Sequence, residues 1–276
     1  MKTPLSRRLV LPAVAALTAA FTAESRAALA AYRNAVLADG ATAYWELDET
    51  SGTTAADSAG GDNNGTYGGG VTPGQPSGRI GLGTSAAFNG SNGHVRILDS
   101  AVFDVSTNAF SVELWYRAET TTRGDLFTYK GAGGDFGVHS SSQNANTASV
   151  YHTGNFRIQN APVNAANGDW NHVVAVRDAG VISFYVNGAF TQSAADGFTM
   201  NITNDILIGS NHDGNPSNLL ISFLGRIDEV AFYPVALTPA QIANHFNLAS
   251  VPEPSASAVA LVLLGAALTA RRRVRR

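Results

Sequence analysis

The sequence predicts an all-β protein, an antiparallel sandwich of two packed sheets. Six segments alternate apolar and polar residues with a period of two, and they are rich in Val, Ile, Tyr and Phe. They span residues 43–48, 110–117, 170–177, 181–186, 205–208 and 226–233. Of the 28 glycines, all but Gly265 lie within residues 28–250, which favours many tight turns. Only two segments have a helical pattern.

Six shorter segments also read as strands, at residues 86–88, 94–97, 126–130, 136–139, 149–152 and 156–159. In the segment 181–186, alternation assigns Ile182, Phe184 and Val186 to the core, and Asn187-Gly188 predicts a two-residue turn after it. Residues 51–83 are rich in Gly, Asp and Asn and are expected to form a long loop.

The two predicted helices lie at the ends of the sandwich. Residues 28–38 are rich in alanine, and we expect them to cap the entrance of the domain. The second helix spans residues 238–248 and begins with Thr238, Pro239 and Gln241, which together form a capping box with a favourable proline.

The net charge of −3 averages unlike pieces of the chain. Residues 1–27 and 251–276 contain nine of the 18 basic residues and only two of the 21 acidic ones, so residues 28–250 carry a net charge of −10. Nucleic acid needs a basic footprint, so it is not an expected partner. The absence of cysteine excludes disulfides, thiolate metal sites and cysteine nucleophiles.

Residues 1–27 have the three parts of a secretory signal peptide. A basic start is followed by an apolar stretch at residues 9–23, and Ser25 and Ala27 supply the small residues of a cleavage site. Cleavage after Ala23 is an alternative, and so is a retained membrane anchor, for which the apolar stretch is short.

The C-terminal residues 251–276 also form a targeting signal. The motif Val251-Pro252-Glu253-Pro254 precedes an uncharged stretch at residues 255–270 and then five arginines, which favour the cytoplasmic side. This order resembles the PEP-CTERM sorting signal of Gram-negative bacteria. The resemblance implies a transmembrane helix over 255–270, transient anchoring in the inner membrane, cleavage by an exosortase, and release to the cell surface or extracellular matrix. The alternative is an ordinary tail anchor.

The ordered motifs of residues 41–248 resemble the LamG-like jelly roll of the concanavalin A-like lectin/glucanase superfamily. They read YWELDETSG at 44–52, FNGSNGHV at 88–95, GDWNHVV at 168–174, YVNG at 185–188 and GRIDEVAFY at 225–233. Residues 28–40 resemble the lead-in segment that precedes such domains. The resemblance implies two packed antiparallel sheets, with the first strand near the strand 226–233.

Some members of this superfamily are glycoside hydrolases, which need two carboxylates at a set separation. Glu46 and Asp48 resemble the start of a catalytic Glu-x-Asp-x-x-Glu pattern, but Ser51 occupies its third acidic position. Asp228 and Glu229 are adjacent, so strand alternation places them on opposite faces. We therefore expect no enzymatic activity, with a degenerate glycosidase as the alternative.

The resemblance also implies a structural Ca²⁺ that ties the early acidic loop to a late strand. The matching positions are Asp57 and Asp228, with backbone carbonyls from residues 60–64. Calcium accepts such hard oxygen ligands in irregular loops. The alternative is that Asp57 caps a turn and that Asp228 is a solvated strand carboxylate.

Glycan binding is the organic function that the resemblance implies. The three tryptophans fall in framework motifs, where we expect burial. The aromatic residues in variable loops are Tyr67, Tyr151, Phe156 and Phe198, and of these we expect Tyr151 and Phe156 to lie on a ligand face, with plain surface as the alternative. The sequence thus predicts an exported, non-catalytic protein that binds an extracellular polysaccharide or a surface glycoprotein. The alternative is a purely structural matrix component without a defined ligand.

Overall fold

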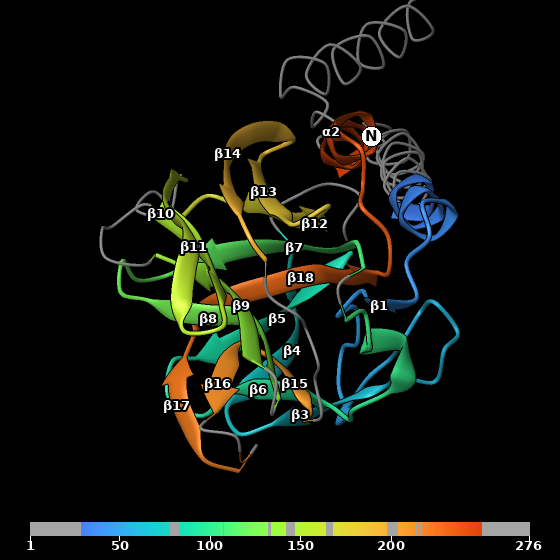
Figure 1. Ribbon diagram of the computed structural model, residues 1–276. Helices are drawn as coiled ribbons and strands as arrows, with labels where there is room; N and C mark the ends of the chain where they lie inside the picture. The colour runs from blue at the N-terminus through green and yellow to red at the C-terminus, as the bar shows by residue number, and fades with distance from the viewer. Residues whose placement is uncertain are drawn as a thin grey trace, which may run out of the picture.

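The chain folds into a sandwich of two eight-stranded antiparallel sheets (Figure 1). The computed structural model describes residues 29–77, 83–106, 108–131, 134–141, 147–163, 168–197, 204–212, 215 and 217–249. The predicted signal peptide, the predicted sorting motif from Val251 to Pro254 and the predicted helix 255–270 lie outside these residues. Within the described residues, no helix is long and apolar enough to cross a membrane.

The first sheet, called sheet A, runs in the order β14-β13-β12-β7-β18-β5-β4, and β1 also pairs with β18. Its strands are β1 (Ala43–Trp45), β4 (Val71–Pro76), β5 (Thr84–Asn89), β7 (Phe110–Ala118), β12 (Asn171–Asp178), β13 (Val181–Val186), β14 (Ala189–Ala195) and β18 (Leu224–Tyr233). The pairing of β1 with β18 confirms that the first strand lies beside the late strand.

The second sheet, called sheet B, runs in the order β11-β10-β9-β8-β15-β6-β3-β2. Its strands are β2 (Thr54–Ala55), β3 (Gly65–Gly68), β6 (His94–Ile97), β8 (Gly124–Gly131), β9 (Gly134–Ser140), β10 (Thr147–His152), β11 (Asn155–Pro162) and β15 (Ile206–Ile208). A separate two-stranded ribbon, formed by β16 (Ser210–His212) and β17 (Leu219–Ser222), follows β15 in the chain. A short 3-10 helix spans Ala101–Phe103.

The main core lies between the two sheets, where alternate residues of each strand point inward. Phe103 contacts the rings of Trp45, Tyr129 and Phe232, and all four side chains are fully buried. In β13, Ile182, Phe184 and Val186 are buried in this core, as alternation predicts. All three tryptophans are buried, which confirms their predicted framework role.

A second apolar layer covers the outer face of sheet A. The helix over residues 29–38 and α2 (Pro239–Ala249) pack there, and Tyr32 and Ile242 are fully buried in the layer. At the start of α2, the Gln241 amide N–H donates to the Thr238 hydroxyl, and the Thr238 N–H donates to the Gln241 side chain, which confirms the predicted capping box.

One buried carboxylate ties this layer together. Glu113 of β7 accepts hydrogen bonds from the hydroxyls of Tyr32 and Tyr233, at 3.1 and 2.7 Å. It also bonds His172 of β12 at 2.7 Å and His245 of α2 at 3.0 Å. His172 therefore has a structural role, and Glu113 joins both helices to sheet A.

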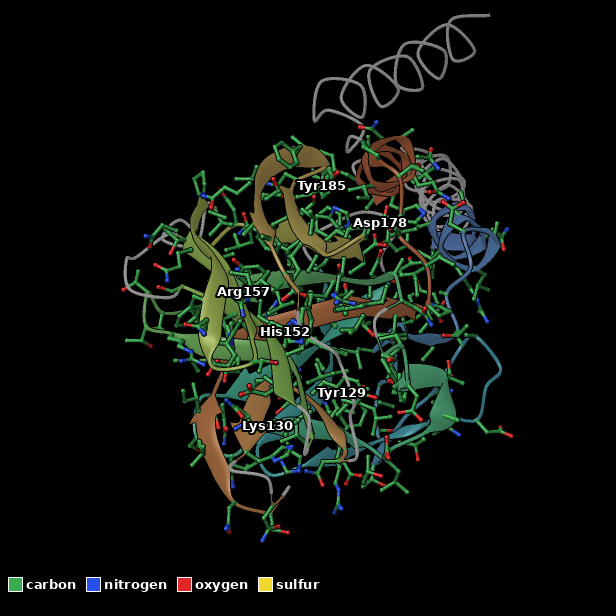
Figure 2. The ribbon with its side chains drawn as sticks, viewed as in Figure 1. Tyr129, Lys130, His152, Arg157, Asp178 and Tyr185 are labelled. Carbon is green, nitrogen blue, oxygen red and sulfur yellow. The ribbon has the colours of Figure 1, made fainter. Side chains whose placement is uncertain are left out.

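A cluster of charges closes one edge of the sandwich. Asp196, just after β14, accepts hydrogen bonds from Arg177 of β12 and pairs with His152 of β10, both at 2.7 Å. Arg157 of β11 lies 3.5 Å from the same carboxylate. Figure 2 shows His152 and Arg157 close to each other on sheet B. Asp196 thus connects the two sheets by charge as well as by packing.

Backbone geometry confirms one predicted turn and corrects the faces on which Asp228 and Glu229 were predicted to lie. Asn187 and Gly188 both have positive φ, 51° and 79°, as the two-residue turn between β13 and β14 requires. In β18, a bulge follows Asp228, and Glu229 has φ 54°. The bulge breaks the alternation of side chains between the two faces, so the expectation that Asp228 and Glu229 lie on opposite faces fails. Both side chains are fully buried.

The expectation of one long loop over residues 51–83 is wrong for its central part, which contains β2, β3 and β4. These strands lie at or near the sheet edges, and their exposed positions are filled by Thr and Pro. Such strands have neither clear alternation nor β-branched runs, so the sequence pattern does not mark them.

Candidate functional site

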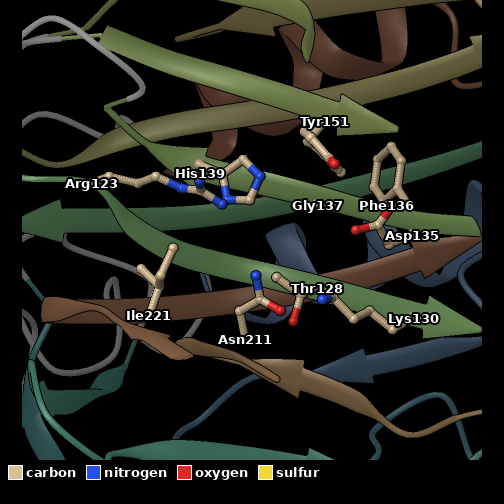
Figure 3. Close-up of a pocket in the computed structure, with 10 residues that line it drawn as sticks. All are labelled: Arg123, Thr128, Lys130, Asp135, Phe136, Gly137, His139, Tyr151, Asn211 and Ile221. Carbon is tan, nitrogen blue, oxygen red and sulfur yellow. The ribbon is translucent and has the colours of Figure 1, made fainter. Parts of the chain in front are cut away.

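A pocket of about 200 Å³ opens on the outer face of sheet B, beside the β16–β17 ribbon (Figure 3). Strands β8, β9 and β10 form its floor and one wall, and the ribbon forms the other. Its lining is polar and aromatic, and comprises Arg123, Thr128, Lys130, Asp135, Phe136, Gly137, His139, Tyr151, Asn211 and Ile221.

The two residues predicted to bind ligand lie together at this pocket. Tyr151 lines it, and Phe156 is its cross-strand neighbour on β11, with ring centroids 5.3 Å apart and an edge-to-face arrangement. Arg123 lies over the Phe156 ring, 5.5 Å from its centroid. Burial and the nearby Asp135 raise the pKa of the Tyr151 hydroxyl, which therefore stays protonated at neutral pH. The pair offers a partly exposed aromatic surface with a hydroxyl at its rim.

A buried charge pair supports the aromatic residues from below. His139 packs edge-on against both rings, and its Nδ1 lies 2.5 Å from Asp125. Arg123 bonds the same carboxylate through two nitrogens, at 3.0 and 3.3 Å. Burial acts to raise the pKa of Asp125, but His139 and Arg123 outweigh it and lower that pKa below its usual range. These contacts hold Arg123 and the aromatic pair in one arrangement.

Gly137 makes room for the imidazole of His139. A Cβ at this position would lie 2.8 Å from Cε1 and 2.9 Å from Nε2 of that ring, closer than real Cβ contacts. The absence of a side chain therefore lets His139 lie along β9 beneath Tyr151, which is paired with Gly137 across the strands.

Two charged side chains of the pocket make no ion pair with each other. Lys130 and Asp135 are register partners on β8 and β9, yet neither makes an ion pair with any described residue. In Figure 3 the Lys130 ammonium points toward Thr128 and Asn211, and Asp135 lies nearer Tyr151. Among the described residues, the pocket thus offers an unpaired cation on β8 and an unpaired carboxylate on the neighbouring strand β9.

The carboxylates at the pocket do not form a glycosidase pair. Hydrolysis of a glycosidic bond needs an acid whose pKa is raised and a second free carboxylate. Asp125 is occupied by His139 and Arg123, and its pKa is lowered. Asp135 is then the one free carboxylate among the described lining residues.

Asp57, one of the two predicted calcium ligands, is fully occupied by hydrogen bonds. Its Oδ1 accepts from the amides of Tyr44 and Ala59 at 3.0 and 2.9 Å. Its Oδ2 accepts from the amide and the side chain of Asn63, both at 3.1 Å. Asp57 therefore caps the turn that follows it, as the alternative reading expects.

Asp228, the other predicted ligand, is fully buried and is not the solvated carboxylate of the alternative reading. Within the described residues, neither of its oxygens makes a hydrogen bond of ordinary geometry, although the Ser77 hydroxyl and the Glu229 amide lie close enough to act on its pKa. Burial and the neighbouring Glu229 raise its pKa, and Asp48 adds to the effect. Burial likewise raises the pKa of Asp48, to about 6. Among the described residues, no group of three or more Asp, Glu or His side chains is arranged as a metal site.

The sequence pointed to some of the pocket and missed the rest. Tyr151 and Phe156 stood out as aromatic residues outside the framework motifs. Asp125, His139 and Lys130 carried no recognisable spacing, because the strand pairing of β8 with β9 brings them to one face. One feature of the sequence could have drawn attention to Lys130, which is the only lysine of residues 28–250.

Comparison with known proteins shows the family. The model of the concanavalin A-like lectin/glucanases superfamily matches residues 89–243, which is more than half of the chain. No curated protein matches the sequence significantly.

Several solved structures share the fold. Domain 4 of AbnA, a GH43 extracellular arabinanase from Geobacillus stearothermophilus solved with arabinotriose, is 23% identical with a TM-score of 0.59, over 76% of this chain and 98% of that one. The binding domain of botulinum neurotoxin serotype D is 11% identical with a TM-score of 0.56, over 76% of this chain and 52% of that one.

A structure of botulinum neurotoxin type C, whose cell entry depends on interaction with two ganglioside molecules, is 13% identical with a TM-score of 0.57. The match covers 77% of this chain and 52% of that one. At these identities the likeness concerns the fold alone. The family match and the two-sheet sandwich agree, and the chain belongs to the concanavalin A-like lectin/glucanases superfamily.

Proposed function

We propose that this protein is a non-catalytic carbohydrate-binding protein that holds a saccharide in the pocket on sheet B. The observation that carries the proposal is the Tyr151–Phe156 pair beside free polar groups in a preformed hollow. Saccharide-sized ligands bind in such pockets, where aromatic rings cover the apolar face of the sugar and a few polar groups fix its orientation. The solved relatives bound to arabinotriose or dependent on gangliosides support this ligand class.

A non-catalytic role follows from which carboxylates at the pocket are free and which are occupied by other side chains. With Asp125 bound to Arg123 and His139, Asp135 is the single free carboxylate that the described lining residues would offer to a glycosidic bond in the pocket. Neither the retaining nor the inverting mechanism works with one carboxylate. Binding without turnover is therefore the function that this geometry supports, and hydrolysis of a bound oligosaccharide would contradict it.

A glycan array with the purified protein and three variants tests the proposal. Tyr151→Ala and Phe156→Ala should each weaken binding of the array's best saccharide at least tenfold, because each removes part of the aromatic surface. Phe190→Ala is the matched control, since Phe190 is 58% exposed on β14 and does not line the pocket. Equal binding by wild type and both pocket variants would overturn the proposal.

We also propose that the protein is exported and displayed at the cell surface or in the extracellular matrix. The proposal rests on residues 1–27 and on the sorting motif around Pro252 and Glu253, which resemble export and exosortase signals. Mass spectrometry of the protein from its native host tests it. Termini trimmed near residue 27 and near Glu253 are expected, and a Glu253→Ala chain should remain in the membrane fraction. Intact termini on the native protein would contradict export by this route.

A structural Ca²⁺ is the third part of the proposal, with Asp228 and Asp48 as its carboxylate ligands and Asp57 outside the site. The supporting observation is that Asp228 is buried, that its two oxygens make no hydrogen bond of ordinary geometry with any described residue, and that it lies close enough to Asp48 for their charges to interact. Bound Ca²⁺ would supply the countercharge that these carboxylates lack.

Thermal denaturation with Ca²⁺ and with EDTA tests the calcium site. Calcium should raise the Tm of the wild type and of Asp57→Asn by a similar amount, and it should leave Asp228→Asn unchanged. Both variants remove one carboxylate oxygen, so they form a matched pair. Equal melting of the wild type in Ca²⁺ and EDTA would reject the site.

A further inference from the structure

Lys130, Arg117 and Arg226 are the three cationic side chains in the described part of the domain that make no ion pair, and of these only Lys130 lines the pocket. Five arginines pair with a carboxylate, and they are Arg33, Arg96, Arg123, Arg157 and Arg177. The ammonium of Lys130 makes no hydrogen bond or ion pair with any residue in the described part of the chain, although residues 28–250 carry a net charge of −10. An acidic domain thus keeps its only lysine unpaired, in its pocket.

The position of Lys130 directs its charge into the pocket. It lies near one end of β8, and Figure 3 shows its ammonium pointing toward Thr128 and Asn211 across the pocket. The Thr128 hydroxyl donates to the carbonyl of Ser210, at 2.8 Å, which fixes the ribbon against β8. The amide of Asn211 lies on that ribbon, so it can act beside Lys130 on one ligand group.

The other charges of the pocket do not neutralise Lys130. Asp125 is occupied by Arg123 and His139 beneath the aromatic pair. Asp135 is the cross-strand neighbour of Lys130 but makes no ion pair with it, and it lies on the Tyr151 side. The pocket therefore presents an unpaired ammonium from β8 and, on the neighbouring strand β9, an acceptor for hydroxyl groups.

We infer that the pocket selects an acidic saccharide, one that carries a carboxylate or a sulfate group. This inference rests on the proposed carbohydrate-binding function and names its ligand class. The anionic group binds Lys130, with the Asn211 amide as second donor, and the sugar ring lies against Tyr151. Sugar hydroxyls donate to Asp135. A charge-assisted hydrogen bond to an ammonium is about twice as strong as a neutral one, so the anionic group gives specificity.

The first experiment is a glycan array that contains neutral, carboxylated and sulfated oligosaccharides of similar length, probed with the full-length protein. The strongest binders should carry an anionic group, and the array separates carboxylates from sulfates as its source. When the best binder is carboxylated, its carboxyl-reduced form should bind at least tenfold more weakly, about 1.4 kcal/mol. When it is sulfated, the desulfated form serves the same purpose.

Three variants assign that preference to Lys130. Lys130→Met should abolish the preference for the anionic form over its neutral counterpart while binding to the neutral form is retained. Lys130→Arg should restore the preference, because it restores the charge. Arg33→Met is the matched control, since it removes one charge at a side chain that is 45% exposed and outside the pocket.

The outcomes separate this inference from the proposed function. Array binding by neutral saccharides alone, or an unchanged preference in Lys130→Met, overturns the inference and leaves carbohydrate binding intact. Binding that Tyr151→Ala does not weaken, or no binding of any saccharide, overturns both.

Discussion

Replacing Glu113 by glutamine tests whether one buried carboxylate holds the two helices to sheet A. Its two oxygens accept hydrogen bonds from Tyr32 and Tyr233 and bond His172 and His245. Burial acts to raise the pKa of Glu113, but the two histidines outweigh it and keep that pKa well below the usual range. The carboxylate is therefore ionised within the apolar layer.

The expected loss in the free energy of unfolding follows from the charge and the hydrogen-bond acceptor that glutamine cannot supply. Its Oε1 still accepts, but its NH₂ group faces donors and leaves one histidine without its negative partner. Breaking a buried ion pair from one side costs about 3–5 kcal/mol, and glutamine retains part of the bonding, so we expect a loss of about 3 kcal/mol. For a domain of this size, that loss lowers the Tm by about 6–12 °C.

Urea denaturation followed by tryptophan fluorescence measures the loss, because Trp115 donates to Tyr32 at 3.1 Å within this layer. Hydrogen exchange should accelerate in residues 29–38 and in α2, and less in β8–β11. Glu49→Gln is the control, since its carboxylate accepts from the Tyr67 hydroxyl at 2.7 Å in a part-buried place and should cost about 1 kcal/mol. A Glu113→Gln loss no larger than the control's would refute the reasoning.

The same cluster sets the pH range of this stabilisation. Because the pKa of Glu113 is lowered on folding, its contribution is present above the unfolded value near 4.5 and is lost as pH falls through the folded value. Burial acts to lower the pKa of His245, but Glu113 and Asp39 raise it above the usual range. The contribution of His245 is therefore full below about pH 6.5 and is lost as pH rises through the folded value.

Three further predictions concern stability and the pocket. Asp196→Asn leaves buried Arg177 without its ion pair and should cost about 3 kcal/mol in urea denaturation, and a cost below 1 kcal/mol would show that the cross-sheet cluster is dispensable. Gly137→Ala should displace His139 and weaken saccharide binding at least tenfold in titration calorimetry, with the fold retained by circular dichroism; unchanged affinity would contradict the crowding. Because burial raises the pKa of Asp48 to about 6, the calcium-free protein should lose stability as pH rises from about 4 to 6, and Asp48→Asn should lose less over that range, whereas an unchanged loss would contradict this role of Asp48.

Much of the fold could be predicted from the sequence because alternation and turn chemistry act locally. The strand Val181–Val186, its Asn187-Gly188 turn and the capping box at Thr238 agree with the structure. Strands with one face in the core carry a clear period of two. The edge strands β2 and β4 do not, because β2 has only two residues and because both faces of β4 are partly exposed.

The sites were less predictable because they depend on register and on local irregularity. A bulge at Glu229 buries two adjacent carboxylates that alternation separates. The pocket joins β8, β9, β10 and the β16–β17 ribbon, so residues about 90 positions apart, such as Arg123 and Asn211, meet there. The sequence shows that Lys130 is the only lysine of residues 28–250, but only strand pairing showed that it lies at the pocket.

A crystal structure of the protein with its strongest array saccharide tests the central claim most directly. The account predicts the sugar on the outer face of sheet B, with its ring in van der Waals contact with Tyr151 and an anionic group within hydrogen-bond distance of the Lys130 ammonium. A saccharide bound elsewhere, with the pocket beside the β16–β17 ribbon empty, would contradict the account.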